Sequence, residues 1–140
     1  MKSFLFEGQR VLLGRLEKGE DILNGLTEFC VSHGVRVGSV QAIGAVQRGG
    51  VGYYDQAAAT YRETRFDEGM EIASLMGNIS QKEGEVFLHC HVILADAEGH
   101  CFGGHLLEGN VAFACEFVVT SLDGPVPERT FDDATGLMLW

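Results

Sequence analysis

The chain has 140 residues, enough for one domain with a hydrophobic core, and its 46% hydrophobic content is ordinary for a globular protein. Twenty acidic residues against ten basic ones give a formal net charge of −10. This negative charge disfavours binding to a nucleic-acid backbone or to an anionic membrane surface, because both kinds of binding depend on Lys and Arg. The short, early-charged amino terminus and the lack of a long uncharged stretch predict a cytoplasmic protein.

A strand and a helix are the first elements expected. Arg10–Leu16 is typical of a strand. Glu20 and Asp21 are expected in the first turn of a helix, where the helix dipole favours negative charge, and His33 with Gly34 marks its end. Between these ends, apolar residues recur at helical spacing: Ile22, Leu23, Leu26, Phe29 and Cys30.

The rest of the chain is expected to be mainly strand, because β-branched residues recur with period two. The predicted strands are Val35–Val46, turning at Gly49 and Gly50, Val51–Asp55 and Thr60–Phe66 as a hairpin, Met70–Ser80, Glu85–Ala95 and His100–Leu107. Residues 111–122 are compatible with strand or helix, and their valine-rich end favours strand. The tail, 123–140, holds both prolines and is expected to be mostly turn, with a short strand at its end.

One helix followed by many strands with short loops predicts an α+β fold. We expect a single domain over residues 1–140, with a largely antiparallel sheet and one main helix packed on it. None of the four cysteines forms a C-x-x-C pair, and all four are expected to be buried free thiols. A disulfide between Cys90 and Cys101, across a hairpin, is the alternative.

Four of the five histidines lie in one segment, "LHCHVILADAEGHCFGGHLLEG", from Leu88 to Gly109. Because side chains alternate along a strand, His89, His91 and Ile93 share one face, and the apolar residues between them share the other. A hairpin turn around Asp96–Gly99 would bring the chain back antiparallel. If that turn is centred near Glu98, His105 falls opposite His91 on the same face, whereas a shift of one residue sends it to the other face.

In the favourable register, His89, His91 and His105 form a cluster of the kind that holds zinc with one position left open. Gly103 and Gly104 would then leave room for water or a ligand. The alternative is that the H-x-H pattern marks solvent-facing strand residues only. His100 is expected to be exposed at the turn. Cys90 points to the apolar face, so it is expected to be an inert thiol.

Five blocks of the sequence resemble the plants-and-prokaryotes conserved (PPC) domain family in family order: "GEDI", "IGAVQRGGVGYYD", "MEIASLMGNIS", "HCHVILADAEGHCFGGHL" and "EFVVTSL". The resemblance covers roughly residues 10–122. It implies a bent antiparallel sheet with a helix, a homotrimer, and zinc on His89, His91 and His105. The family's fold is also similar to that of acetolactate decarboxylase, where zinc held by histidines helps a carboxylate leave.

Two functions remain open from the sequence, beside the alternative that the chain is an assembly domain whose histidines only stabilise the trimer. One is a metal-dependent protein that binds or transforms a small molecule, with lyase or hydrolase chemistry. A carboxylate is expected to orient the imidazoles, and Glu71 is the candidate for this role or for that of general base; the alternative is that Glu71 is a surface residue of a strand. The other is a regulatory, DNA-binding protein, by analogy with plant relatives that attach this domain to AT-hooks. The chain has no AT-hook segment and is acidic, which weighs against the second function.

Overall fold

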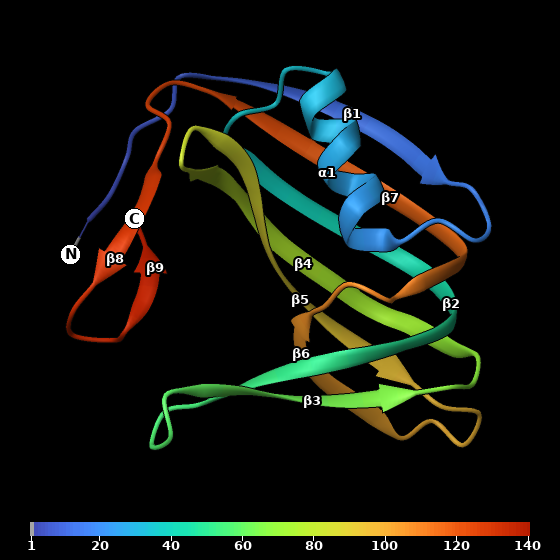
Figure 1. The fold of residues 1–140 in the computed structure, drawn as a ribbon. Coiled ribbons are helices and arrows are strands. Elements are labelled where there is room, and N and C mark those ends of the chain that lie inside the picture. Colours follow the sequence, from blue (N-terminus) through green and yellow to red (C-terminus); the bar gives the residue numbers. More distant parts are fainter. Residues whose placement is uncertain (1) are drawn as a thin grey trace.

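A curved sheet with one helix against it makes up residues 2–140, the part of the chain that the computed structural model describes (Figure 1). The elements are β1 (Gly8–Leu16), α1 (Ile22–Ser32), β2 (Gly38–Asp55), β3 (Thr60–Phe66), β4 (Met70–Lys82), β5 (Glu85–Ala95), β6 (Cys101–Leu106), β7 (Val111–Asp123), β8 (Glu128–Asp132) and β9 (Leu137–Leu139). The strand order is β1-β7-β2-β6-β5-β4-β8-β9, and β3 pairs with β2. The mainly antiparallel sheet with one helix agrees with the predicted α+β class.

Helix α1 begins at a capping aspartate. The Asp21 carboxylate accepts a hydrogen bond from the backbone N–H of Asn24 at 3.0 Å, which satisfies one of the free N–H groups of the first turn. Glu20 and Asp21 therefore precede the first turn and do not lie in it, a small correction to the prediction. The helix ends at His33, and Gly34 has the positive φ of 66° expected after a helix. Three side chains spaced by four residues bury one face: Ile22, Leu26 and Cys30.

Strand β2 is bent and changes partners along its length. Its first half pairs with β7 and β4, whereas Val51 and Gly52 pair with β6 and the end of the strand pairs with β3. The pairings β2–β4, β4–β5, β5–β6 and β6–β2 therefore close a ring of strands. The predicted turn at Gly49 and Gly50 is wrong: the glycines lie in the bend of one continuous strand.

A buried asparagine secures this bend. The Asn110 side chain accepts from the Gly50 N–H at 3.1 Å and donates to the Gly50 carbonyl at 3.0 Å, and it also donates to the Leu107 carbonyl at 2.8 Å. It thus satisfies backbone groups that the bend removes from the strand ladder. Gly49 leaves the space for it, because a Cβ there would meet Asn110 Oδ1 at 2.2 Å. This contact holds the end of β6 against β2.

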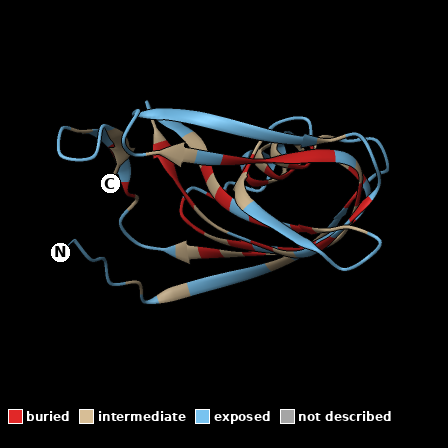
Figure 2. Cartoon of the chain, turned by 90° about the horizontal axis from the view of Figure 1, so that it is seen from below, coloured by how far each residue is buried: buried red, intermediate tan, exposed pale blue. Residues whose placement is uncertain are grey.

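Buried residues alternate with more exposed ones along several strands of the sheet, and Figure 2 colours them red. Because side chains alternate between the two faces of a strand, the buried ones share one face of the curved sheet, the inner face. Helix α1 covers part of this inner face, where it contacts β1, β5 and β7. On β5 the buried residues are Leu88, Cys90, Val92 and Leu94, the face that the alternating pattern predicts. The opposite face, which we call the outer face, carries exposed apolar side chains: Val11, Leu13, Ile43, Met76 and Ile93.

The tail departs from the prediction. Residues 128–139 form the β8–β9 hairpin, and β8 pairs parallel to β4, with Lys82 opposite Arg129. The prediction that the tail is mostly turn is therefore wrong for residues 128–132, which form β8. Strand β9 agrees with the short strand predicted at the end of the tail. Strand β7 resolves the open choice for residues 111–122 in favour of strand.

All four cysteines are free thiols, so the alternative disulfide between Cys90 and Cys101 is wrong. Cys90 is buried as expected, whereas Cys101 is exposed, contrary to the prediction.

Within residues 2–140, no helix is long and apolar enough to cross a bilayer.

Candidate metal centre

The β5–β6 hairpin brings three histidines to one side of the sheet. His91 and His105 are directly opposite each other in the strand pairing, which is the favourable one of the two registers that the sequence left open. His89 lies two residues before His91 on the same face. One nitrogen from each ring lies within 4.8 Å of the others. The structure therefore gathers His89, His91 and His105 into one cluster.

The three rings pack closely enough for one ion. His89 Nε2 and His105 Nδ1 are 3.2 Å apart. The ring centroids of His91 and His105 are 4.3 Å apart, and those of His89 and His91 are 5.4 Å apart. Zinc bonds of about 2.0–2.1 Å in a tetrahedron would separate ligand atoms by roughly 3.3–3.4 Å. The separation between His89 and His105 is close to this edge, and the nitrogen of His91 lies within 4.8 Å of both, so the three imidazoles suit a zinc ion.

The electrostatics keep two of the rings neutral, which is the form that binds metals. Burial, with smaller contributions from Arg129, His105 and His91, lowers the pKa of His89 to about 4. Burial and then the charge of His91 lower the pKa of His105 as well. The lowered pKa values favour the uncharged form of both rings at neutral pH, and a neutral imidazole offers one nitrogen lone pair to a cation.

This pKa shift predicts a pH-dependent stability of the metal-free protein. The pKa of His89 is about 4 in the folded chain and 6.5 when unperturbed, so the unfolded chain binds more protons between these values. The free energy of unfolding should fall as the pH drops from about 6.5 to about 4, and the contribution of His89 should level off below that. Urea unfolding of chelator-treated protein at several pH values between about 4 and about 6.5 measures this change in the free energy of unfolding. A His89→Gln variant should show a shallower decline, and an equal decline would contradict the assignment.

The glycines before His105 have different surroundings. A Cβ on Gly103 would meet no atom nearer than 3.6 Å, so this glycine leaves space on the face of His105, as the sequence suggested. A Cβ on Gly104 would meet the Gly52 carbonyl oxygen at 2.4 Å. Gly104 therefore does not leave room for a ligand; it lets β6 approach the bent part of β2, where Gly52 pairs with His105.

Glu71 is not brought to the histidines. It is exposed, pairs with Ala95 at the far end of β4, and lines a separate cavity with Gln47 and Asp96. Met76, the β4 residue opposite His91, is five positions away, which is roughly 16 Å along a strand. Within residues 2–140, the recorded hydrogen bonds join no carboxylate to the three rings, contrary to the expected orienting carboxylate.

A second group of metal-binding residue types lies at the β5–β6 turn: Asp96, Glu98 and His100. Asp96 uses its carboxylate to hold the turn, since it accepts from the N–H groups of Glu98 at 3.0 Å and His100 at 2.8 Å and contacts the His100 ring. His100 is exposed, as expected. Through its bonds to these backbone N–H groups, Asp96 shapes the hairpin and, with it, the register of His105.

Two residues beside the cluster were not predicted from the sequence. The Tyr61 ring packs edge-on against His105, with centroids 5.4 Å apart. Arg129 lines the same cavity as His89 and His105. The only sequence signal for Arg129 is the short run "ERTFD" in the tail, whose polar and apolar residues do not mark a functional position.

Three solved structures are similar to this chain over almost its whole length. A metal-containing protein from Archaeoglobus fulgidus is 43% identical, with a TM-score of 0.95, and the match covers 100% of this chain and 99% of that one. A plant- and prokaryote-conserved protein from Pyrococcus horikoshii is 35% identical, with a TM-score of 0.90 and coverage of 100% and 95%. A candidate DNA-binding protein from Bacteroides thetaiotaomicron is 29% identical, with a TM-score of 0.86 and coverage of 98% and 94%.

The sequence comparisons identify the family. No curated protein matches the chain significantly. Residues 5–123 match the family described as the Plants and Prokaryotes Conserved (PCC) domain, and the same stretch contains the three histidines. The chain therefore belongs to the Plants and Prokaryotes Conserved domain family, the family that its sequence blocks resemble.

Proposed function

We propose that this protein binds one zinc ion per chain on His89, His91 and His105 and uses it to bind or transform a small molecule. The observation that carries the proposal is the convergence of three imidazole nitrogens, all within 4.8 Å of one another. Three histidine ligands are typical of zinc sites that keep one coordination position open. The metal-containing relative from Archaeoglobus fulgidus, at 43% identity, supports a metal in this fold.

The surroundings of the cluster suit a ligand. A cavity of about 320 Å³ adjoins the rings of His89 and His105, near the lower limit of ordinary small-molecule sites. When bound, a zinc ion supplies Lewis-acid polarisation of an oxygen or activation of water. Tyr61 and Phe87 line the cavity and would shield a ligand from solvent. Lyase and hydrolase chemistry both fit this arrangement.

Zinc titration of chelator-treated protein tests the proposal. We expect calorimetry and elemental analysis to give one zinc per chain, with the folded structure retained in both states. A chain that takes up no zinc at saturating concentration would contradict it. The same titration with Mg²⁺ should give no tight binding, because imidazole nitrogens are poor ligands for that ion.

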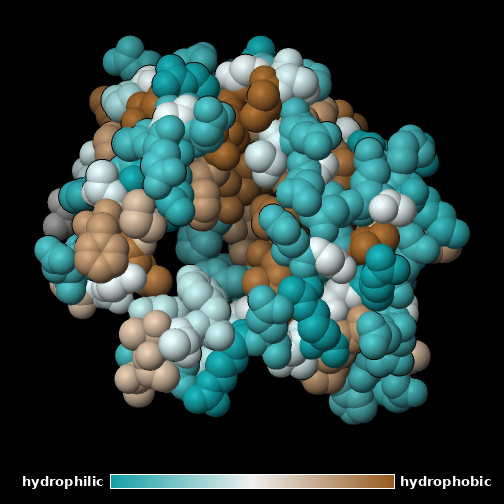
Figure 3. Space-filling model, viewed as in Figure 1, coloured by the Kyte–Doolittle hydropathy of each residue, from teal (hydrophilic) through white to brown (hydrophobic). Residues whose placement is uncertain are grey.

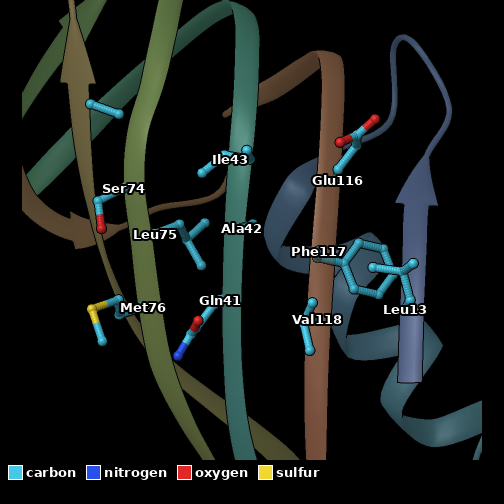
Figure 4. A pocket seen from close by; sticks show the side chains of 11 residues that line it. Leu13, Gln41, Ala42, Ile43, Ser74, Leu75, Met76, Glu116, Phe117 and Val118 are labelled. Carbon is cyan, nitrogen blue, oxygen red and sulfur yellow. The ribbon is translucent and has the colours of Figure 1, made fainter. Parts of the chain in front are cut away.

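We further propose that copies of the chain assemble through the outer face into a homotrimer. Strand pairing places Leu13, Val118, Gln41, Met76 and His91 in one row across the sheet. A groove of about 380 Å³ runs among the first four of these residues, with Ile43 beside it (Figure 4). Leu13, Ile43 and Met76 are 59–80% exposed, and such an apolar surface favours protein association. Because this row continues from His91 to His105, assembly would bring a neighbouring chain close to the histidine cluster.

An Ile43→Lys variant should dissociate the assembly. Ile43 is opposite Glu116, so the lysine gains a favourable neighbour in the single chain but would be desolvated against another copy. Analytical ultracentrifugation at micromolar concentration should show a trimer for the natural protein and a monomer for the variant. Val31→Lys, on the exposed side of α1, is the matched control and should remain a trimer. A natural protein that sediments as a monomer would disprove this assembly.

DNA binding is the alternative that the sequence left open. The relative from Bacteroides thetaiotaomicron is described as a candidate DNA-binding protein, and it is 29% identical to this chain. Twenty acidic residues against ten basic ones weigh against it, because DNA affinity rests mainly on cationic side chains that neutralise phosphates. Zinc-dependent recognition of a small molecule is therefore the function that we favour.

A further inference from the structure

Two cationic side chains line a cavity between the β8–β9 hairpin and the histidine cluster. Figure 3 shows a hollow between this hairpin and the rest of the molecule. The cavity of about 320 Å³ is lined by Arg129, Lys82, Phe87, His89 and His105, among others. None of its lining residues is acidic. In a chain with a net charge of −10, a concave site with two cationic side chains and no carboxylate is unusual.

The guanidinium of Arg129 is buried without a counter-ion. The residue is only 5% exposed, and its recorded hydrogen bonds go to neutral oxygens: Ser80 Oγ, Asn78 Oδ1 and the Met138 carbonyl. In the described range 2–140 it forms no salt bridge. A buried charge costs free energy unless an opposite charge accompanies it. A purely structural link between β4 and the hairpin would not need a charge.

Arg129 has N–H groups that an acceptor entering the cavity could use. A guanidinium has five N–H groups in a planar fork, and the three recorded bonds leave two of them available. Lys82 adds a second cation, and both cations lie over the Phe87 ring, with Arg129 Cζ 4.9 Å and Lys82 Nζ 5.9 Å from its centroid. The aromatic ring thus supports two positive groups beside the open end of the cavity.

We propose that this cavity binds a small anion, with its carboxylate or phosphate group on Arg129 and Lys82 and another part of the molecule facing the histidine cluster. This inference rests on the proposed function, because it names the class of ligand that the zinc site would take. Charge-assisted hydrogen bonds from a planar guanidinium suit both acidic groups. An apolar or cationic ligand would leave Arg129 buried and unpaired.

Isothermal titration calorimetry on the zinc-loaded protein tests the proposal by measuring the binding of three probes: malonate, inorganic phosphate and neutral malonamide. We expect binding of malonate, phosphate or both, and no measurable binding of malonamide. The preference between the two anions identifies the acidic group. Arg129→Gln should weaken anion binding roughly tenfold or more while zinc is retained. Lys18→Gln, which removes a surface cation beside Phe113, is the matched control and should bind as the natural protein does.

Three results would overturn the inference: neither anion binds, malonamide binds equally well, or Lys18→Gln weakens binding as much as Arg129→Gln. If Arg129→Gln does not fold, Arg129→Lys and Lys82→Gln replace it, and each should weaken binding of the same anion. Zinc content measured on every sample separates the two proposals. Zinc without anion binding refutes this inference alone, whereas Arg129-dependent anion binding without zinc refutes only the proposed metal function.

Discussion

Replacing His91 by alanine is expected to abolish stoichiometric zinc binding and leave the fold intact. His91 is exposed, so its removal opens no cavity in the core. In the proposed site it provides one of the three ligand nitrogens, and the two remaining imidazoles would not complete a stable site. We expect the zinc affinity to fall by on the order of a hundredfold or more. Competition with a chromophoric chelator measures the affinity, and circular dichroism checks the fold.

His100→Ala is the matched control for this experiment. His100 belongs to the same hairpin and is also exposed, but its ring contacts Asp96 at the turn and does not belong to the cluster. The variant should bind zinc with an affinity close to that of the natural protein. Equal losses in the two variants would mean that the hairpin as a whole, and not the three-histidine cluster, determines zinc binding.

The local pattern of the sequence was sufficient for most of the site. Period-two alternation on β5 separates His89 and His91 from the buried face of Leu88 and Val92, and the structure confirms this division. The position of His105 depended on the register, which the sequence left open. The turn decides it: the Asp96 carboxylate accepts two backbone N–H groups and fixes the hairpin so that His91 and His105 are paired.

Features that depend on contacts between distant segments could not be predicted in the same way. The bend of β2 at Gly49 and Gly50 is stabilised by Asn110, about sixty residues later, so local propensity indicated a break where the strand continues. Arg129 lies beside the histidine cluster because β8 pairs parallel to β4, a long-range contact with no local signal. Glu71 was matched to the site by family resemblance alone, and the strand register places it at the other end of β4.

The close approach of β6 to β2 has a direct consequence for zinc binding. Gly104 precedes His105, and a Cβ there would lie 2.4 Å from the Gly52 carbonyl oxygen, which is backbone and cannot rotate away. A Gly104→Ala variant must therefore push β6 away from β2. We expect a loss of about 1–3 kcal/mol in the free energy of unfolding, as for other overpacked positions. Because Gly52 pairs with His105, the imidazole should move as well.

Zinc affinity should thus fall in Gly104→Ala although no ligand is removed, by roughly tenfold, as for other changes that disturb how a ligand is held. Gly103→Ala is a demanding control, because the two glycines are adjacent and the added methyl group is the same. A Cβ on Gly103 meets only ordinary contacts at 3.6 Å and beyond, so stability and zinc affinity should stay near those of the natural protein. Urea unfolding and chelator competition on both variants separate the outcomes. Should Gly104→Ala bind zinc as tightly as Gly103→Ala, the contact between β2 and β6 is not what positions His105.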